Sequence, residues 1–174
     1  MDISDAIKLI EKAVNPHIQQ TWLDLGAGDG LFTLALSNVI TQPSTIVGVD
    51  VERRGTFKAL SHPFHNIQFL NADFTDVRKL PAPIDGMLMA NALHFVEDKL
   101  TLLRSFHSLL KPAGKLIVLE YDLEKANRWV PYPIRQNDLT SLAIKCGYAN
   151  PEKLGEHKST LNNSNIYSIA LGKQ

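Results

Sequence analysis

Short apolar runs alternate with segments of helical period along most of the chain. Thr21–Leu25 is a short β-type run that ends at a cluster of glycines, and the residues from Leu31 to Val39 then return to helical spacing. The same alternation repeats further along. It predicts five strands, each followed by a helix or a turn, at Thr21–Leu25, Thr45–Val49, Ile67–Leu70, Gly86–Ala90 and Lys115–Tyr121.

Helical spacing also recurs between and before these strands. Apolar residues from Ile3 to Val14 lie three or four positions apart, which predicts a short amphipathic helix that Pro16 ends. Further helices are expected at residues 52–60, at residues 100–110, where Lys111–Gly114 ends the helix, and at residues 137–146.

The last part of the chain has a different pattern. Two β-like stretches, around Lys153–Thr160 and Ile166–Leu171, are joined through Asn162–Asn165, which predicts a terminal antiparallel hairpin. The earlier strands are almost wholly apolar and alternate with helices, so we expect a parallel sheet covered on both faces. The predicted fold class is therefore α/β: a doubly wound, mostly parallel, Rossmann-like sheet with a C-terminal antiparallel hairpin. A long loop, Asp122–Arg135, is expected to cover an active site.

The glycine cluster follows the first predicted strand. In open α/β sheets, ligands bind beyond the carboxyl ends of the strands, and this turn lies at such an end. Gly26 and Gly28 permit unusual backbone angles and the close approach of a ligand, and Gly30 permits tight packing of the next helix. Leu31 stands where the G-x-G-x-x-G fingerprint of NAD and FAD sites has its third glycine. The pattern therefore departs from that of a dinucleotide site.

Acidic residues lie beside the turn and after the next two strands. Asp24 and Asp29 would repel a pyrophosphate and attract a sulfonium and an ammonium, so their charge favours S-adenosylmethionine. Asp50 lies about 20 residues past the turn, where an acid is expected to meet a ribose diol. Asp73 and Phe74 are predicted to contact and line the adenine pocket. Local alternatives remain: Asp24 and Asp50 as caps for backbone amides, and Asp73 as part of a turn with Thr75.

Several segments together resemble one known family. They are Leu23–Gly30, Val49–Asp50, Asn71–Phe74, Asp85–His94 and Leu110–Leu116, and in this order they are similar to the class I S-adenosylmethionine-dependent methyltransferases over nearly the whole chain. The resemblance implies a seven-stranded sheet, with Asp24 and the glycine turn near the methionine part, Asp50 on the ribose and Asp73 near the adenine. We assign to the cofactor site Asp24, Gly26, Ala27, Gly28, Gly30, Asp50, Val51, Asp73, Phe74 and Asn91. Within the family, Ala90–Phe95 is most similar to small-molecule methyltransferases of the quinone-biosynthesis type, and it names no substrate.

Candidate catalytic and substrate residues follow the fourth and fifth strands. His94 is predicted to orient or deprotonate a substrate hydroxyl or amine, and a structural histidine is the alternative. Tyr121, Trp129 and Tyr132 occupy or border the long loop, so they are predicted to form an aromatic wall over the substrate. The alternative is that these aromatic side chains only anchor the loop.

No metal site is assigned. His62-Pro63-Phe64-His65 has no accompanying carboxylates or thiols, and Asn91 and Glu120 alone form no convincing cluster. Cys146 lies on the apolar face of its predicted helix and is expected to belong to the core.

Size and charge limit the choice of function. The 174 residues are predicted to form a single domain, 1–174, with a short N-terminal helix. Lys and Arg total 18, as do Asp and Glu, so no overall field attracts a nucleic acid or a membrane. The single cysteine and the lack of a signal-type N-terminus or a long apolar run favour a cytoplasmic location. The sequence leaves the oligomeric state open.

The predicted reaction is S-adenosylmethionine-dependent methyl transfer to an oxygen, nitrogen or carbon atom of a small molecule. The leaving group is already activated, so alignment of the reactants, which contributes roughly 7–11 kcal/mol, outweighs a general base worth roughly 3–5 kcal/mol. A nucleic-acid methyltransferase is an alternative, disfavoured by the charge balance and by the absence of an Asn- or Asp-Pro-Pro-Tyr motif after the fourth strand. A non-catalytic module that binds S-adenosylmethionine to regulate a partner is another.

Overall fold

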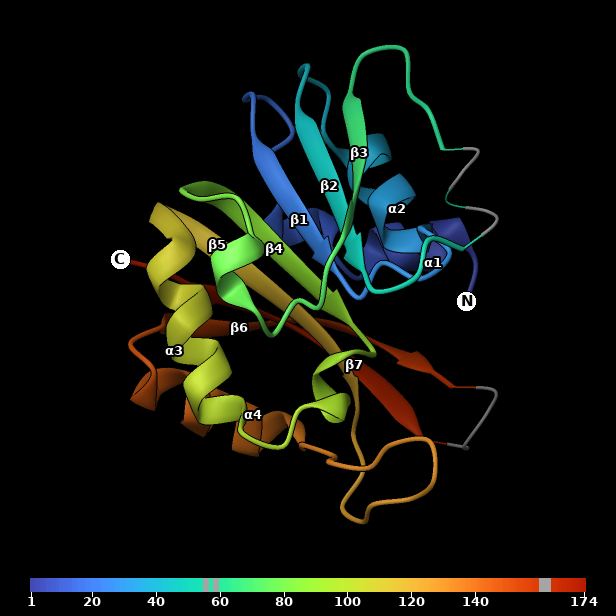
Figure 1. Ribbon diagram of the computed structural model, residues 1–174. Coiled ribbons are helices and arrows are strands. Elements are labelled where there is room, and N and C mark those ends of the chain that lie inside the picture. Colours follow the sequence, from blue (N-terminus) through green and yellow to red (C-terminus); the bar gives the residue numbers. More distant parts are fainter. Residues whose placement is uncertain (55–56, 58–59, 160–163) are drawn as a thin grey trace.

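A seven-stranded sheet with the order β3-β2-β1-β4-β5-β7-β6 runs through the computed structural model, which describes residues 1–54, 57, 60–159 and 164–174 (Figure 1). The first five strands pair in parallel, and β7 pairs antiparallel with both β5 and β6. This arrangement confirms the predicted fold class. The strands are β1 (Thr21–Leu25), β2 (Thr45–Asp50), β3 (Asn66–Asn71), β4 (Ile84–Ala90), β5 (Leu110–Tyr121), β6 (Ala149–Lys158) and β7 (Asn165–Gly172).

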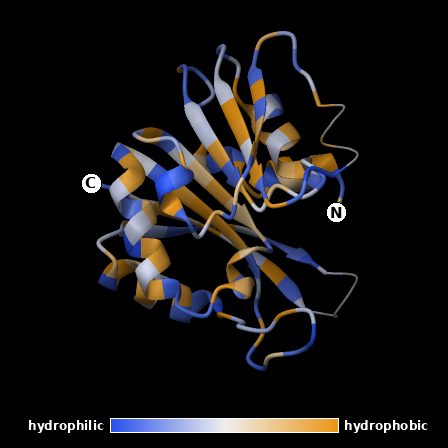
Figure 2. Cartoon of the chain, in the orientation of Figure 1, coloured by the Kyte–Doolittle hydropathy of each residue, from blue (hydrophilic) through white to orange (hydrophobic). Residues whose placement is uncertain are grey.

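Helices cover both faces of the sheet. Residues of α1 (Ile3–Lys8) and α2 (Leu31–Val39) pack against one face, and residues of α3 (Lys99–Leu109) and α4 (Gln136–Lys145) pack against the other (Figure 1). In α3 and α4, apolar and polar residues alternate along the helix, and the apolar ones pack towards the sheet (Figure 2). Short 3-10 helices lie at Glu11–Ala13, Val77–Lys79 and Leu93–Phe95.

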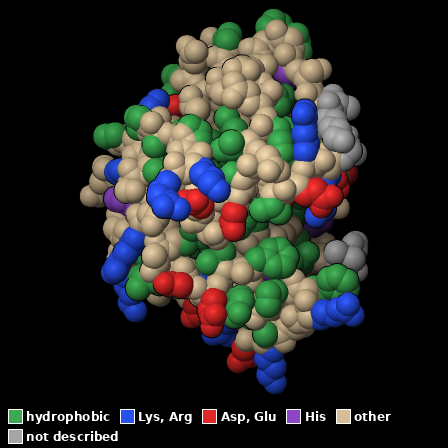
Figure 3. All heavy atoms as spheres, in the orientation of Figure 1, with side chains coloured by type: hydrophobic (Ala, Val, Ile, Leu, Met, Phe, Trp, Pro, Cys, Tyr) green, Lys and Arg blue, Asp and Glu red, His purple; other side chains and the backbone are tan. Residues whose placement is uncertain are grey.

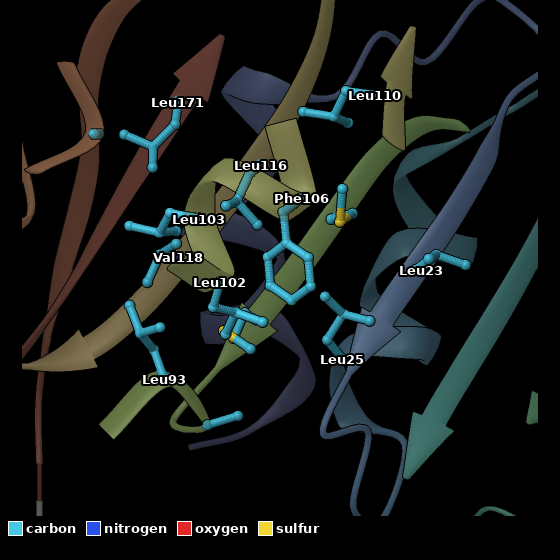
Figure 4. Close-up of a cluster of buried hydrophobic side chains, with 14 of the residues drawn as sticks. Leu23, Leu25, Leu93, Leu102, Leu103, Phe106, Leu110, Leu116, Val118 and Leu171 are labelled. Atoms are coloured by element: carbon cyan, nitrogen blue, oxygen red, sulfur yellow. The ribbon is translucent and has the colours of Figure 1, made fainter. Parts of the chain in front are cut away.

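The sheet divides the buried side chains into two cores. Because side chains alternate along a strand, Met87 and Met89 of β4 belong to the core under α3 and α4, while Leu88 belongs to the core under α1 and α2. Figure 4 shows the first of these cores, where Phe106 of α3 points towards Leu23 and Leu25 of β1. The near-continuous apolar strands of the sequence thus reflect burial on both faces.

The N-terminal helix is shorter than predicted. The α-helix α1 ends at Lys8, and a 3-10 turn at Glu11–Ala13 follows it, instead of one helix that reaches Val14. The backbone carbonyl of Leu9 accepts a hydrogen bond of 2.6 Å from the Ser168 hydroxyl of β7. The partner lies 159 positions away in the sequence, so the helical spacing of the N-terminal segment could not predict this contact at the end of the helix.

The connection between β2 and β3 also departs from the prediction. Residues 52–54 are not helical, and the amide of Glu52 donates to the Asp50 carboxylate at 3.2 Å instead of beginning a helix. The remainder of the predicted helix falls at 55–56 and 58–59, outside the described residues, and at Phe57 and Leu60. Phe57 is buried.

Two other element boundaries differ from those expected. β5 begins at Leu110 rather than Lys115, because Leu110 pairs with Ile84 of β4, and on the other edge Ala113 donates to the Lys173 carbonyl and Lys173 donates to the Gly114 carbonyl. β6 begins at Ala149 rather than near Lys153. The predicted end of that strand at Thr160, and part of the predicted connection, lie outside the described residues. None of the helices in the described part of the chain is long and apolar enough to cross a membrane.

Candidate functional site

The turn after β1 places three glycines in left-handed conformations. Gly26, Gly28 and Gly30 have φ values of 77°, 53° and 84°, which disfavour a side chain. A Cβ atom at Gly26 would lie 2.8 Å from the Cβ of Ala92, so this glycine also lets the segment after β4 approach the turn. Gly30 is the N-cap of α2. The turn therefore needs glycines for its backbone conformation and, at Gly26, for the close approach of Ala92.

Asp50 connects the end of β2 to this turn. One oxygen of its carboxylate accepts from the Gly28 amide at 2.9 Å, and the other accepts from the Glu52 amide at 3.2 Å. A carboxylate has about four acceptor positions, so further hydrogen bonds from a ligand can be accepted. Asp50 is thus both a support of the turn and a polar group at its surface.

A pocket of about 450 Å³ lies beyond the carboxyl ends of the parallel strands. Its volume falls within the range of roughly 300–1,000 Å³ that is typical of small-molecule sites. The pocket brings together seven of the predicted cofactor residues: Gly26, Gly28, Asp50, Val51, Asp73, Phe74 and Asn91.

Sequence reasoning missed other residues of this wall. Arg54, Thr75, Ala92, Phe95 and Val96 also line the pocket. Phe95 is 62% exposed, and its place directly after the candidate His94 was the signal available in the sequence. Arg54 has no such signal, because it belongs to the segment that was predicted to be helical.

Asp73 forms a turn with Thr75 and also lies on the pocket wall. Its carboxylate accepts from the amide of Thr75 at 2.9 Å and from the hydroxyl of Thr75 at 2.7 Å, which is turn chemistry. It also lines the pocket together with Phe74. The turn holds the acidic side chain at the pocket wall.

Asp24 lies behind the turn rather than on the pocket wall. Its carboxylate is 2% exposed and accepts from the Thr33 hydroxyl of α2 at 2.6 Å. Burial raises the pKa of Asp24 from 3.8 to about 6, the Thr33 hydrogen bonds oppose this rise, and the charge of Asp50 adds to it. A cation bound at the turn would favour the ionised form of Asp24.

His94 forms a buried pair with Glu120 at the end of β5. The His94 amide donates to one Glu120 oxygen at 3.0 Å, and Nδ1 lies 2.8 Å from the other oxygen. The side chains of His94 and Glu120 are 4% and 1% exposed. His94 is not among the residues on the wall of the large pocket or of the smaller one described below.

The three aromatic candidates occupy different places. The Tyr132 amide donates to the His94 carbonyl at 3.0 Å, and the Lys99 ammonium lies 5.6 Å from the centre of the Tyr132 ring. Trp129 is 70% exposed, with the Arg128 guanidinium 5.5 Å from its ring. Hydrophobic side chains are exposed between acidic and basic ones on the face seen in Figure 3. Tyr121 is the member of this set that lines a pocket.

A second, smaller pocket of about 240 Å³ adjoins the first at Asn91, which belongs to both walls. It is lined by Met1, Leu31, Phe32, Asn91, Tyr121, His157, Ser159 and Ile166. Within the described ranges, no group of three or more His, Cys, Asp or Glu side chains gathers as a metal site would.

The polar groups of the large pocket fit a cationic adenosyl ligand. Two carboxylates, one guanidinium (Arg54) and left-handed glycines lie on its wall, and one further carboxylate lies behind the turn, so acidic groups outnumber the basic one. Hydroxyls of a ribose, an exocyclic amine and a positive charge all find acceptors there. The pocket therefore matches the chemistry of S-adenosylmethionine better than that of a pyrophosphate.

The sequence matches the methyltransferase domain family over residues 3–167. It is 30% identical over 144 residues to an uncharacterized methyltransferase of Mycobacterium tuberculosis, and the match covers 81% of this chain and 67% of the relative. It is also 31% identical over 110 residues to the ubiquinone/menaquinone biosynthesis C-methyltransferase UbiE of Coxiella burnetii, where the match covers 59% of this chain and 43% of the relative.

Solved structures with the same fold have lower sequence identity. The 1,6-didemethyltoxoflavin-N1-methyltransferase of Burkholderia thailandensis, solved with 1,6-didemethyltoxoflavin and S-adenosylhomocysteine bound, has a TM-score of 0.76 at 17% identity and covers 99% of this chain and 78% of its own. An S-adenosylmethionine-dependent methyltransferase of Aquifex aeolicus has a TM-score of 0.73 at 16% identity and covers 98% and 90%. At these identities the likeness shows the fold alone.

Proposed function

We propose that this chain, which belongs to the class I S-adenosylmethionine-dependent methyltransferases, methylates an oxygen, nitrogen or carbon atom of a small molecule. The observation that supports a site for this cofactor most directly is the large pocket, where Asp50, Asp73 and the glycine turn come from the ends of different strands and share one wall. The modest volumes of both pockets support a small acceptor.

Each part of the cofactor has a proposed partner. Gly26, Ala27, Gly28 and Gly30 form the turn that faces the methionine part, and the buried Asp24 carboxylate attracts its positive charge through the turn. Asp50 accepts from the ribose hydroxyls. The adenine lies between Val51 and Phe74, with Asp73 accepting from its amine, and Asn91 closes the pocket on the side of the acceptor.

Methyl transfer needs alignment more than side-chain chemistry. When bound, the cofactor supplies an activated methyl group, and the residues of this chain have to hold the acceptor in line with it and exclude water. The turn is fixed by the Gly26 and Ala27 amides, which both donate to the Val49 carbonyl at 2.8 and 3.1 Å. A turn held this firmly keeps its shape when the cofactor binds, which favours alignment.

His94 has a proposed positioning role. Its carbonyl accepts from Tyr132, and Glu120 fixes its side chain, so His94 connects the end of β4 to the loop 122–135. We propose that Tyr132 and Trp129 shield the acceptor through this loop, while Tyr121 lines the acceptor side directly. Contact between His94 and the acceptor would require the pair with Glu120 to open.

Calorimetric titration with S-adenosylmethionine and with NAD under identical conditions tests the cofactor. We expect saturable binding of S-adenosylmethionine only, and binding of NAD alone would refute the proposal. Incubation with a pool of metabolites should then release S-adenosylhomocysteine, and mass detection should find a product heavier by one methylene. Binding without release from any pool would instead indicate a regulatory module, and methylation of nucleic acid alone would refute a small-molecule acceptor.

A further inference from the structure

The smaller pocket has features of a binding site in its own right. It lies between the start of α2, the end of β5 and the β6–β7 pair, and it adjoins the large pocket through Asn91. Leu31, Phe32 and Ile166 form its apolar side. Its volume of about 240 Å³ is below the roughly 300–1,000 Å³ of sites for drug-sized ligands. It therefore suits a molecule of one or two rings.

Asn91 has a polar atom that lacks a partner. Its side-chain oxygen is buried, and within the described residues it accepts no hydrogen bond. The backbone fixes its position, since the Asn91 amide donates to the Leu119 carbonyl at 2.9 Å and φ is 51°. Buried acceptors are nearly always satisfied in folded proteins. An unsatisfied one in a wall shared by two pockets indicates a ligand that donates a hydrogen bond.

The other polar groups of the pocket show which ligand charge it accepts. Burial and the charge of Glu120 raise the pKa of Tyr121, and a hydrogen bond with Ser159 partly offsets this rise. The Tyr121 hydroxyl therefore stays neutral. His157 lies 3.7 Å from the carboxylate of Asp5. The described wall contains no Lys, Arg, Asp or Glu side chain that would pair with a charged ligand. The pocket therefore favours an uncharged molecule with an apolar body.

We propose that this pocket holds the methyl acceptor, an uncharged one- or two-ring molecule that donates a hydrogen bond from a hydroxyl or an amine to the Asn91 side-chain oxygen. This inference rests on the proposed function for the cofactor. The acceptor oxygen or nitrogen forms the bond to the methyl carbon as the carbon–sulfur bond breaks. The electron pair stays on sulfur, which becomes neutral, and the proton of the acceptor passes to water.

Binding of small probes in the presence of S-adenosylhomocysteine tests the pocket. The probes are phenol, aniline and 6-hydroxyquinoline, each with a partner that lacks the donor (toluene or quinoline), together with the charged benzoate and benzyltrimethylammonium. We expect saturable binding of the neutral donors, followed by chemical shifts of residues around Asn91, and weaker binding of the other probes. Preference for a charged probe, or equal binding with and without the donor, would overturn the proposal.

Variants of Asn91 separate the acceptor from the cofactor. Asn91→Gly suits the positive φ and removes the side-chain oxygen, and we expect it to weaken binding of the neutral donors about fivefold or more at saturating S-adenosylhomocysteine, where a change in cofactor affinity does not enter the comparison. Asn91→Asp keeps an oxygen at this place and should restore much of the donor binding. Asn150 also has a positive φ, of 47°, and lies on β6, so Asn150→Gly is the matched control for backbone effects.

The possible failures are distinguishable. If the natural chain does not bind S-adenosylmethionine, the proposed function fails. If it binds the cofactor and Asn91→Gly weakens this binding tenfold without affecting the neutral donors, the Asn91 oxygen faces the cofactor and the acceptor proposal alone fails. Thermal unfolding of each variant shows that a loss of binding does not reflect a loss of folded protein.

Discussion

At the scale of single residues, the Asp50 carboxylate supports the glycine turn and faces the pocket. We expect Asp50→Ala to weaken S-adenosylmethionine binding at least tenfold, because a hydrogen bond to a charged group contributes about 1.5–3 kcal/mol. Asp50→Asn retains one oxygen and should lose less affinity. Calorimetric titration measures both effects.

The control for Asp50 is another carboxylate away from the pocket. Asp76 pairs on the surface with Arg78 and Lys79, and exposed pairs contribute little to stability. Asp76→Ala should leave the Kd of S-adenosylmethionine within a factor of two. If Asp50→Ala behaves in the same way as this control, the ribose assignment is wrong.

The raised pKa of Asp24 leads to a prediction of how cofactor affinity depends on pH. Its pKa is about 6 in the folded chain, so the carboxylate acquires its charge as the pH rises through 6. Because that charge attracts a cationic ligand, binding of S-adenosylmethionine should become tighter between pH 5 and pH 7, with proton release on binding near pH 6. In Asp24→Asn the dependence in this range should be flatter, and an unchanged slope would mean that another group causes it.

The same group affects stability in the opposite direction. The pKa of Asp24 is higher in the folded chain than the ordinary 3.8, so the folded state binds the proton more tightly than the unfolded state does. The stabilisation from this protonation is complete below pH 3.8 and is lost as the pH rises to about 6. The difference corresponds to about 3 kcal/mol. Urea unfolding without ligand should therefore find Asp24→Asn at least as stable as the natural chain at pH 7.

Residue type and spacing were enough to identify most of the wall of the large pocket. Asp50, Asp73 and the glycines follow predicted strands, and parallel strands bring their carboxyl ends together, so sequence order implies proximity. Depth is different. That Asp24 lies behind the turn follows from its hydrogen bond to Thr33 of α2, and that His94 is buried follows from its pairing with Glu120, 26 positions further along the chain.

At the scale of elements, the pair between His94 and Glu120 joins the ends of β4 and β5 to the loop 122–135. Removing the carboxylate in Glu120→Ala leaves the His94 amide and Nδ1 buried without their acceptor. We expect the free energy of unfolding to fall by roughly 3 kcal/mol or more, and proteolysis within 122–135 to become faster. Urea unfolding and limited proteolysis measure the two effects.

Glu156 provides the comparison for that change. It pairs with Lys153 on the exposed face of β6, so Glu156→Ala should alter the free energy of unfolding by no more than about 0.5 kcal/mol. Equal losses in the two variants would show that the buried pair does not hold the loop. A loss confined to Glu120→Ala supports the positioning role of His94.

Strands were easier to predict than helices in this chain. Apolar runs such as Thr21–Leu25 are buried on both faces, so the pattern itself reflects the sheet. The N-terminal helix failed to reach Val14 because the Leu9 carbonyl bonds to Ser168 of β7. β5 begins early because Leu110 pairs with Ile84 of β4, 26 positions earlier, and because Ala113 and Gly114 bond to Lys173 at the other end of the chain. Both departures are caused by contacts distant in sequence, which periodicity does not contain.

At the scale of the whole molecule, one sheet joins two cores and the pocket. Leu23 of β1 belongs to the core under α3 and α4, its neighbour Trp22 to the core under α1 and α2, and the strand ends at the glycine turn. Each core thus shares the central strands with the other. Because the two cores share these strands, we expect the chain to unfold in one cooperative transition.

Because the pocket is built from the ends of these same strands, cofactor binding should stabilise the whole molecule rather than one part. A ligand at 100 times its Kd adds about 2.7 kcal/mol to the free energy of unfolding, which for a chain of this length raises Tm by roughly 5–10 °C. Thermal scans should find this shift with S-adenosylmethionine, about half of it or less in Asp50→Ala at the same concentration, and none with NAD. Two separate transitions, of which only one moves with ligand, would show that the cores unfold independently despite the shared strands.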